Sequence, residues 1–198
     1  MPLLEVLEKE LGRFQLELNS NQLSTMARYC DELVRWNAKM NLTGLAGAEL
    51  VRRLVVEPAW IATQLRLSGT LLDIGSGNGS PAIPLHVVSD LSKTHLVEAR
   101  AKRAAFLRHL VSFLKLENVV VHRIRLEEVG AELGRLEWIS LQGVAMTDEL
   151  LETIKKISHA TTRVVWITSD PKTPIPPAER LAVPLTNTEA LIFRLDLT

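Results

Sequence analysis

The chain has 198 residues, with 23 basic and 23 acidic side chains and a formal net charge of zero. Its hydrophobic fraction of 46% is typical of a globular protein and excludes global disorder. The single cysteine, Cys30, excludes a disulfide framework and a cysteine-rich zinc site, and the five histidines show no paired spacing for a metal. No apolar run approaches the roughly 20 residues that span a bilayer, and residues 1–20 alternate leucine with charged residues, unlike a secretory signal. We therefore expect a cytoplasmic protein that binds neither a membrane nor a metal.

The first third of the chain is predicted to be helical. Apolar residues three and four apart predict helices over residues 3–16, 21–38 and 48–66. Ser20 is a suitable N-cap for the second helix, and a loop is expected at residues 41–47. Pro58 should bend or break the third helix, because proline lacks the backbone N–H. We predict an N-terminal helical cap over residues 1–66.

Beyond Gly69, short β-branched runs alternate with helical stretches. Strands are predicted at residues 70–74, 94–98, 118–124, 136–141 and 163–168. Helices are predicted between them at residues 81–89, 100–116, 128–134 and 148–157. This alternation indicates a parallel sheet with helices on both faces.

The last part of the chain predicts a different strand arrangement. A proline-rich loop is expected at residues 171–177. The runs 181–185 and 190–195 then flank a short polar turn and predict a terminal antiparallel hairpin. We therefore assign residues 67–198 to a Rossmann-like α/β domain that forms one compact unit with the cap.

The most informative motif is a glycine-rich turn between the first strand of this domain and a helix. It reads D-I-G-S-G-N-G-S-P from Asp73 to Pro81. The glycines allow a tight turn and leave the backbone open to a ligand. Ser80 is a suitable N-cap and Pro81 suits a first helical turn. Asp73 can accept hydrogen bonds from loop amides or from a bound amine.

The spacing of this loop indicates the kind of ligand. A dinucleotide fingerprint needs glycine at the sixth loop position, where Ser80 stands. The pattern G-x-G-x-G, with an acid two residues ahead, resembles motif I of class I S-adenosylmethionine-dependent methyltransferases. Glu98 ends the next strand, where a carboxylate can bind both ribose hydroxyls in either class. Residues 125–128 follow the third strand, where such methyltransferases hold the adenine. The pattern favours a methyl donor over NAD, and a Rossmann oxidoreductase stays as an alternative.

Three further segments resemble a single family. Residues 36–43 read W-N-A-K-M-N-L-T, residues 102–108 read K-R-A-A-F-L-R, and residues 116–119 read L-E-N-V. These strings resemble the glucose-inhibited division protein B family, and the resemblance runs from about residue 20 to residue 150. Members of that family are bacterial methyltransferases that act on a guanine N7 of small-subunit ribosomal RNA. The resemblance implies a class I methyltransferase fold, S-adenosylmethionine as cofactor, and ribosomal RNA or the small ribosomal subunit as partner.

The resemblance and the loop together imply two sets of site residues and no catalytic acid or base. Guanine N7 carries a lone pair and no proton, so its attack on a sulfonium methyl needs position and orientation but no general base. The residues expected to bind the cofactor are Asp73, Gly75, Ser76, Gly77, Gly79, Ser80, Glu98, Leu126, Glu127 and Gln142. The residues expected to contact RNA phosphates are Arg52, Arg100, Lys102, Arg103 and Arg108.

The sequence departs from the family pattern at four places. The family's Arg-His followed by Asp-Ser is here the segment 52–57, R-R-L-V-V-E, which keeps only the first arginine. Ser80 replaces an apolar residue, Gln142 replaces the arginine of Ser-Arg-Ala, and Ser169-Asp170 replaces Lys-Gly. The losses at Gln142 and after the fifth strand remove positive charge where RNA would enter. A second hypothesis therefore stays open: a methyltransferase fold with lost or changed activity that serves as a cofactor-binding or interaction module.

Overall fold

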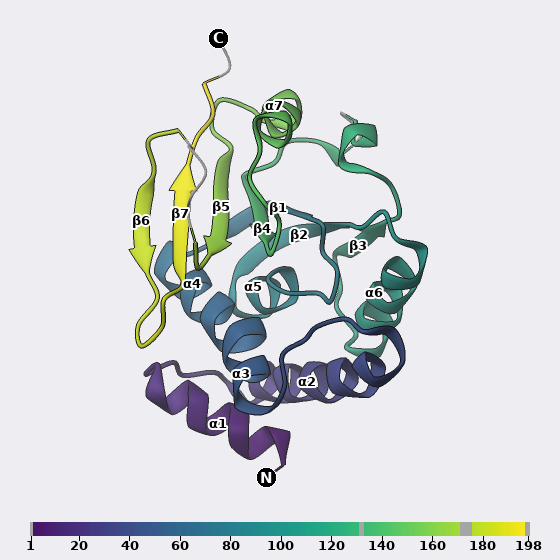
Figure 1. Cartoon of the computed structure of the whole chain (residues 1–198), viewed down its shortest axis with the longest axis vertical. Coiled ribbons are helices and arrows are strands. Elements are labelled where there is room, and N and C mark those ends of the chain that lie inside the picture. The colour runs from purple at the N-terminus through teal and green to yellow at the C-terminus, as the bar shows by residue number, and fades with distance from the viewer. Residues whose placement is uncertain (1, 131–132, 171–175, 197–198) are drawn as a thin grey trace.

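Seven strands form one mixed sheet in the computed structural model, which describes residues 2–130, 133–170 and 176–196 (Figure 1). The strands are β1 (Ser68–Ile74), β2 (Asp90–Val97), β3 (Val119–His122), β4 (Trp138–Gln142), β5 (Arg163–Thr168), β6 (Glu179–Ala182) and β7 (Glu189–Phe193). Their order is β3-β2-β1-β4-β5-β7-β6. Strands β1 to β5 pair in parallel, and β7 pairs antiparallel with both β5 and β6. The predicted parallel sheet and terminal hairpin are therefore confirmed.

Helices cover the two faces of the sheet unequally. They are α1 (Leu3–Arg13), α2 (Ser20–Met40), α3 (Gly47–Val51), α4 (Glu57–Leu65), α5 (Ala82–Val88), α6 (Ala101–Phe113) and α7 (Asp148–Ile157). Successive residues of a strand point to opposite faces. Leu71 belongs to an apolar cluster with side chains of α1 to α6, while Leu72 belongs to another with Ile154 of α7. Both leucines are fully buried. Helices on both faces are thus confirmed, with most of them on one face.

The N-terminal helices share their hydrophobic core with the sheet. Leu7 of α1 and Tyr29 and Leu33 of α2 are fully buried, and they belong to the same apolar cluster as Leu71 of β1. Figure 1 shows α1 to α4 along one side of the sheet. We propose that the cap of residues 1–66 and the domain of residues 67–198 form one cooperative unit. Among the described helices, none is both long and apolar enough to cross a bilayer.

The start of α2 differs from the prediction by one residue. Asn19, and not Ser20, is the N-cap, because its side chain accepts a hydrogen bond from the Gln22 backbone N–H at 3.0 Å. The Gln22 side chain accepts from the Asn19 backbone N–H at 3.0 Å. This reciprocal capping box satisfies two free backbone donors, which a cap at Ser20 would leave without those partners.

The irregularity predicted around Pro58 takes the form of a π-helical turn. The turn covers Arg52–Val56, between α3 and α4, and the Glu57 N–H donates to the Arg52 carbonyl. Pro58 then falls in the first turn of α4, and it has no N–H to donate to a carbonyl of the π-helical turn before it. Helical backbone therefore continues from α3 to α4 with one wide turn.

The helix predicted at residues 128–134 is not formed in its described part; a 3-10 turn at Leu126–Glu128 precedes it. Gly130 and Gly134 lie within that segment, and glycine is unfavourable inside helices. Residues 131–132, and residues 171–175 of the predicted proline-rich loop, lie outside the described residues.

The shared core predicts how α1 contributes to stability. Leu7→Ala should lower the free energy of unfolding by about 2–5 kcal/mol, because it removes a fully buried side chain and leaves a cavity. Leu4→Ala is the matched control, since Leu4 lies on the same helix with 44% of its surface exposed, and it should change stability by less than about 0.5 kcal/mol. Urea unfolding followed by circular dichroism measures both. Equal effects, or a separate transition for α1, would contradict the shared core.

Candidate functional site

A pocket of about 520 Å³ opens at the carboxyl ends of β1, β4 and β5. The strand order reverses between β1 and β4, and ligands of open α/β sheets bind at such a reversal. The loop after β1 forms one wall, and residues 142–145 and 166–170 form another. The π-helical turn contributes Arg53 and Leu54, and the loop after α2 contributes Leu42 and Leu45. The volume lies within the roughly 300–1,000 Å³ usual for ligand sites.

Two glycines of the glycine-rich loop have different surroundings: one lies against α5 and the other lines the pocket. Gly79 has φ +95°, a backbone conformation that favours glycine, and a Cβ there would lie 2.7 Å from Ile83 Cδ1 of α5. Gly77 has φ +47°, and a Cβ there would lie 3.5 Å from an Arg103 nitrogen and 4.0 Å from Glu98 Oε2. Only Gly77 of these two lines the pocket.

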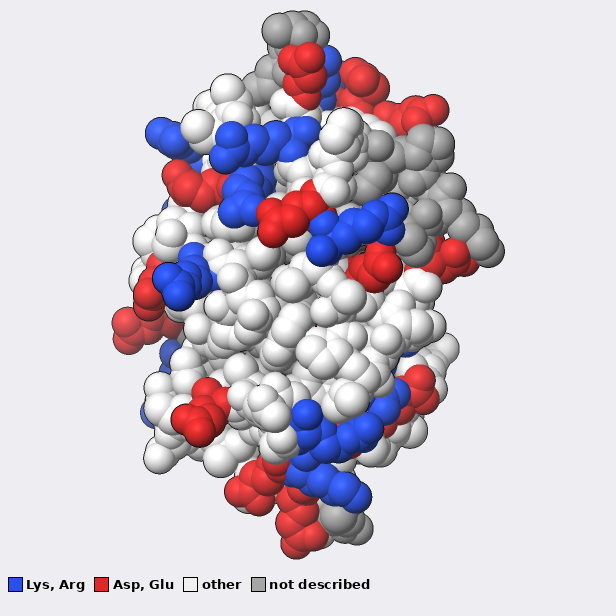
Figure 2. All heavy atoms as spheres, turned by 90° about the vertical axis from the view of Figure 1, so that its left-hand side faces the viewer, with Lys and Arg blue, Asp and Glu red and all other residues white. Residues whose placement is uncertain are grey.

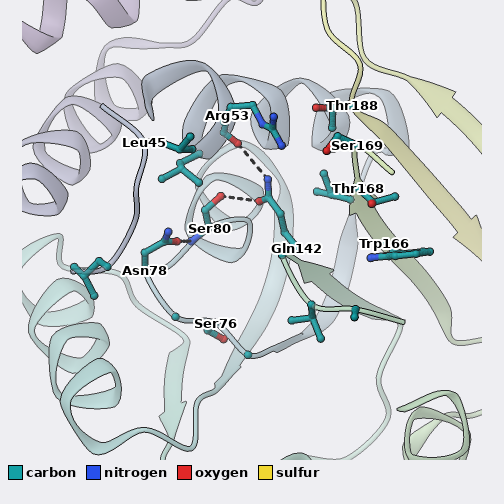
Figure 3. A pocket seen from close by; sticks show the side chains of 18 of the residues that line it. Leu45, Arg53, Ser76, Asn78, Ser80, Gln142, Trp166, Thr168, Ser169 and Thr188 are labelled. Carbon is teal, nitrogen blue, oxygen red and sulfur yellow. Dashed lines mark hydrogen bonds between the residues drawn. The ribbon is translucent and has the colours of Figure 1, made fainter. Parts of the chain in front are cut away.

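Ser80 does not cap the helix that follows it, contrary to the sequence prediction. Pro81 occupies the cap position of α5, and no side chain caps that helix. The Ser80 hydroxyl instead donates to Gln142 Oε1 at 3.0 Å, and the Gln142 amide donates to the Arg53 carbonyl at 3.3 Å (Figure 3). Two residues at which the sequence departs from the family pattern are therefore bonded to each other across the pocket.

Asp73 lies beneath the loop and is fully buried. Its Oδ1 accepts a hydrogen bond from the Ser140 hydroxyl at 2.6 Å, while Oδ2 has no partner among the described residues. Burial raises the pKa of Asp73 to about 7, although the hydroxyls of Ser140 and Ser76 oppose this shift. A buried acceptor without a donor is costly, and Asp73 is not among the residues that line the pocket.

Glu98 ties the loop to the start of α6. Its Oε2 accepts from the Gly77 N–H at 3.1 Å, and its Oε1 accepts from the Arg100 N–H at 2.7 Å. The carboxylate is 5% exposed, and Arg103 beside it lines the pocket. The structure thus brings the two predicted acids, Asp73 and Glu98, to the loop from behind.

The other predicted cofactor-binding residues do not all line the same cavity. Gly75, Ser76, Gly77, Ser80 and Gln142 line the pocket, together with Arg103. Leu126 and Glu127 instead line a second cavity of about 490 Å³ beside α7.

The predicted RNA-binding residues differ in exposure. Arg100, Lys102 and Arg108 are exposed at α6, whereas Arg103 is half-buried at the pocket. Arg52 is half-buried beside Glu57.

A charged cluster at the π-helical turn was not predicted from the sequence. Glu57 is fully buried, with Arg52 Nε 3.7 Å from one carboxylate oxygen and Arg53 Nε 3.8 Å from the other. Burial raises the pKa of Glu57, against the opposing effects of the nearby Thr188 hydroxyl and the two arginines. Arg53 and Thr188 both line the pocket. The only signal in the sequence was the departure from the family pattern at residues 52–57.

The fold and the site together define a class. The sheet order, the glycine loop after β1 and the acid after β2 are those of the Rossmann-like fold of class I S-adenosylmethionine-dependent methyltransferases. The precorrin-6y C5,15-methyltransferase of Geobacter metallireducens GS-15 has a similar fold, with a TM-score of 0.53 and 14% identity over 76% of this chain and 89% of that chain. A mutant of MtNAS gives a TM-score of 0.55 with 15% identity over 88% of this chain and 72% of that chain. Both likenesses concern the fold alone.

Sequence comparison is more specific, and the chain belongs to the rRNA small subunit methyltransferase G family (GidB), whose model matches residues 22–173. The ribosomal RNA small subunit methyltransferase G of Chloroflexus aggregans is 36% identical over 142 residues, or 69% of this chain, and that of Helicobacter hepaticus is 35% identical over 127 residues, or 64% of this chain. The chain spans 60% of the first relative's length and 69% of the second's. The family that the sequence resembles is therefore confirmed.

The buried carboxyl of Asp73 predicts a pH dependence of stability. Because its pKa is raised to about 7 in the fold, the native state keeps a proton that the unfolded chain loses above about pH 4. The free energy of unfolding should therefore fall, relative to Asp73→Asn, by on the order of 2 kcal/mol between about pH 5 and about pH 8. Asparagine can still accept from Ser140, so it is a conservative variant. Parallel pH profiles of the two proteins would show that Asp73 does not titrate in this range.

Proposed function

We propose that this protein transfers a methyl group from S-adenosylmethionine to guanine N7 of small-subunit ribosomal RNA. The observation that carries the proposal is the family match over residues 22–173, a range that includes the loop after β1 and most of the pocket lining. The relatives from Chloroflexus aggregans and Helicobacter hepaticus are named ribosomal RNA small subunit methyltransferase G. We extend ribosomal RNA methylation to this chain, with guanine N7 as the acceptor implied by the family resemblance.

The pocket has features that suit S-adenosylmethionine. The loop from Gly75 to Ser80 presents backbone groups to the pocket, and Glu98 lies behind Gly77, where it could accept from both ribose hydroxyls. Asp73 is fully buried and does not line the pocket, and we keep it as a proposed cofactor residue from its place in the loop pattern. The methionine end would lie between Ser76, Ser80 and Gln142. We keep Leu126 and Glu127 as the proposed adenine residues from their place after β3.

The proposed methyl transfer requires the side chains to position the two substrates and requires no general base. Bound S-adenosylmethionine supplies an electrophilic methyl group on a positively charged sulfur, and guanine N7 has no proton to remove. The pocket therefore has to hold the base in line with the methyl group and keep water away. Leu45 and Trp166 (Figure 3), together with Leu42, provide apolar walls for this purpose.

We propose that α6 provides the RNA-binding surface. Its sequence carries Lys102, Arg103 and Arg108 and no acidic residue, and Arg100 precedes it. On the face that carries β6 and α4, by contrast, basic and acidic side chains lie intermixed around an uncharged centre (Figure 2). Arg163 and Arg180 are paired there with Glu179 and Glu189. An excess of basic over acidic side chains attracts phosphate, which favours α6, with Arg52 as a further contact near the pocket.

A second candidate is a cofactor-binding module that does not methylate ribosomal RNA. The observation that favours it is Gln142, a neutral residue held by Ser80 and the Arg53 carbonyl, where the family pattern has arginine. Both candidates predict binding of the cofactor, and only the first predicts methyl transfer.

Glu98→Ala should weaken the binding of S-adenosylhomocysteine by more than about tenfold, because charge-assisted hydrogen bonds contribute roughly 1.5–3 kcal/mol. Isothermal titration calorimetry measures the affinity, and circular dichroism verifies that the variant folds. Glu117→Ala, at an exposed acid just after α6, is the control and should leave the affinity unchanged. Undiminished binding by folded Glu98→Ala would remove the ribose assignment.

Methyl transfer itself is tested with small ribosomal subunits from a strain that lacks this methyltransferase. We expect labelled methyl from S-adenosylmethionine to appear in the ribosomal RNA as 7-methylguanosine, identified by nuclease digestion and mass spectrometry, with Glu98→Ala as the inactive control. Cofactor binding without transfer to subunits or to naked RNA would favour the second candidate. A wild-type protein that binds neither S-adenosylmethionine nor S-adenosylhomocysteine would overturn both.

A further inference from the structure

The wall of the pocket at the π-helical turn carries an excess positive charge. Arg52 and Arg53 share the single carboxylate of Glu57, at 3.7 and 3.8 Å. These contacts are ion pairs without hydrogen bonds: the Nε atoms of both arginines and both carboxylate oxygens have no hydrogen-bond partner among the described residues. One carboxylate against two guanidinium groups leaves a net positive charge.

Only one of the two arginines reaches the pocket. Arg53 lines it, next to Gln142 and on the side of Thr188 (Figure 3), whereas Arg52 is not among the lining residues. The two side chains are otherwise alike, with exposures of 27% for Arg52 and 28% for Arg53. The π-helical turn places them on either side of Glu57, and such turns often occur at functional sites.

Arg53 lies next to position 142, where this chain lacks the arginine of the family pattern. The family pattern has arginine at position 142 and histidine after Arg52, and this chain has Gln142 and Arg53 instead. The Gln142 amide donates to the Arg53 carbonyl at 3.3 Å, so the two positions are adjacent. A fixed positive charge is thus absent from the β4 wall and present on the wall beside it.

We propose that Arg53 binds the α-carboxylate of the methionine part of S-adenosylmethionine, an inference that rests on the proposed function. A guanidinium group matches a carboxylate with two parallel N–H donors. Arg53 lies at the Ser80 end of the glycine-rich loop, where Gln142 bonds both Ser80 and the Arg53 carbonyl, whereas Arg103 lies at the other end, beside Gly77 and Glu98. Arg103 is therefore closer to the proposed ribose site, and Arg53 is the cation on the methionine side.

Ser80 and Gln142 have a supporting part in this arrangement. The Ser80 hydroxyl holds Gln142 Oε1, which directs the amide N–H group of Gln142 toward the Arg53 backbone. The amide thereby links the glycine loop to the π-helical turn. The substitution of an apolar residue by Ser80 and of arginine by Gln142 makes this link possible, since an apolar side chain could not donate the hydrogen bond.

Calorimetry with two ligands and two variants tests the proposal. S-adenosylhomocysteine carries the carboxylate, and 5′-methylthioadenosine shares the nucleoside and thioether but lacks it. Arg53→Gln should weaken S-adenosylhomocysteine binding by about tenfold or more and change 5′-methylthioadenosine binding by less than about threefold. Arg52→Gln, which removes the other partner of Glu57, should leave both affinities within about threefold of wild type. The double variant Arg53→Gln with Gln142→Arg should recover most of the lost affinity, because it returns the charge to the β4 wall.

The other possible results distinguish a failure of the carboxylate contact from a failure of the proposed function. An equal loss of both ligands in Arg53→Gln, or no loss of either, overturns the carboxylate contact while leaving the nucleoside site in place. An unchanged S-adenosylhomocysteine affinity with weaker binding of ribosomal RNA would assign Arg53 to a phosphate and also overturn it. If the wild-type protein binds neither ligand, the proposed function itself fails. Arg53→Lys provides a second folded variant that keeps the charge but loses the paired donors, and it should show an intermediate loss.

Discussion

The burial of β1 on both faces is the constraint on which the site depends. Leu71 and Leu72 are fully buried against opposite helical layers, so the chain can turn toward solvent only where the strand ends. The neighbours of β1 are β2 on one side and β4 on the other, and the connections from these strands leave in opposite directions. The gap that opens above β1 and β4 is the pocket, and the glycine loop must lie at its edge.

Three buried carboxyl groups surround this gap, and each is accommodated differently. Glu98 accepts two backbone N–H groups, Asp73 accepts one hydroxyl and has one free oxygen, and Glu57 lies between two arginines without a hydrogen bond. A structure selected only for stability would avoid such groups, because burying them is costly. Their concentration around one pocket is the pattern expected where local stability is subordinate to ligand binding.

The sequence predicted those features that depend on nearby residues. The residue ranges of β5 and α7 match the prediction at both ends, because periodicity and capping are local. Ser80 shows the limit: local rules favour it as an N-cap, but its hydroxyl binds Gln142, which is 62 positions away. The Gln142 amide then binds Arg53, 89 positions away. No periodicity connects such positions, so the hydrogen-bond chain across the pocket could be found only in three dimensions.

The distribution of charge around the pocket separates the surfaces that would hold the cofactor and the RNA. The cation on the β4 wall is replaced by a neutral amide, and Arg53 is recessed beside a buried glutamate with 28% exposure. Arg53 lines the pocket and Arg52 does not, so Arg53 is the cation placed for a small carboxylate that enters the pocket. In the proposed function, the attraction of RNA would therefore rest on α6, with Arg52 as a further contact, and the retention of the cofactor on Arg53. Among the described charged residues, Arg103 is shared by α6 and the pocket, whereas Arg53 lines the pocket alone. Changes in cofactor affinity and in RNA affinity should therefore be separable by mutation of Arg53.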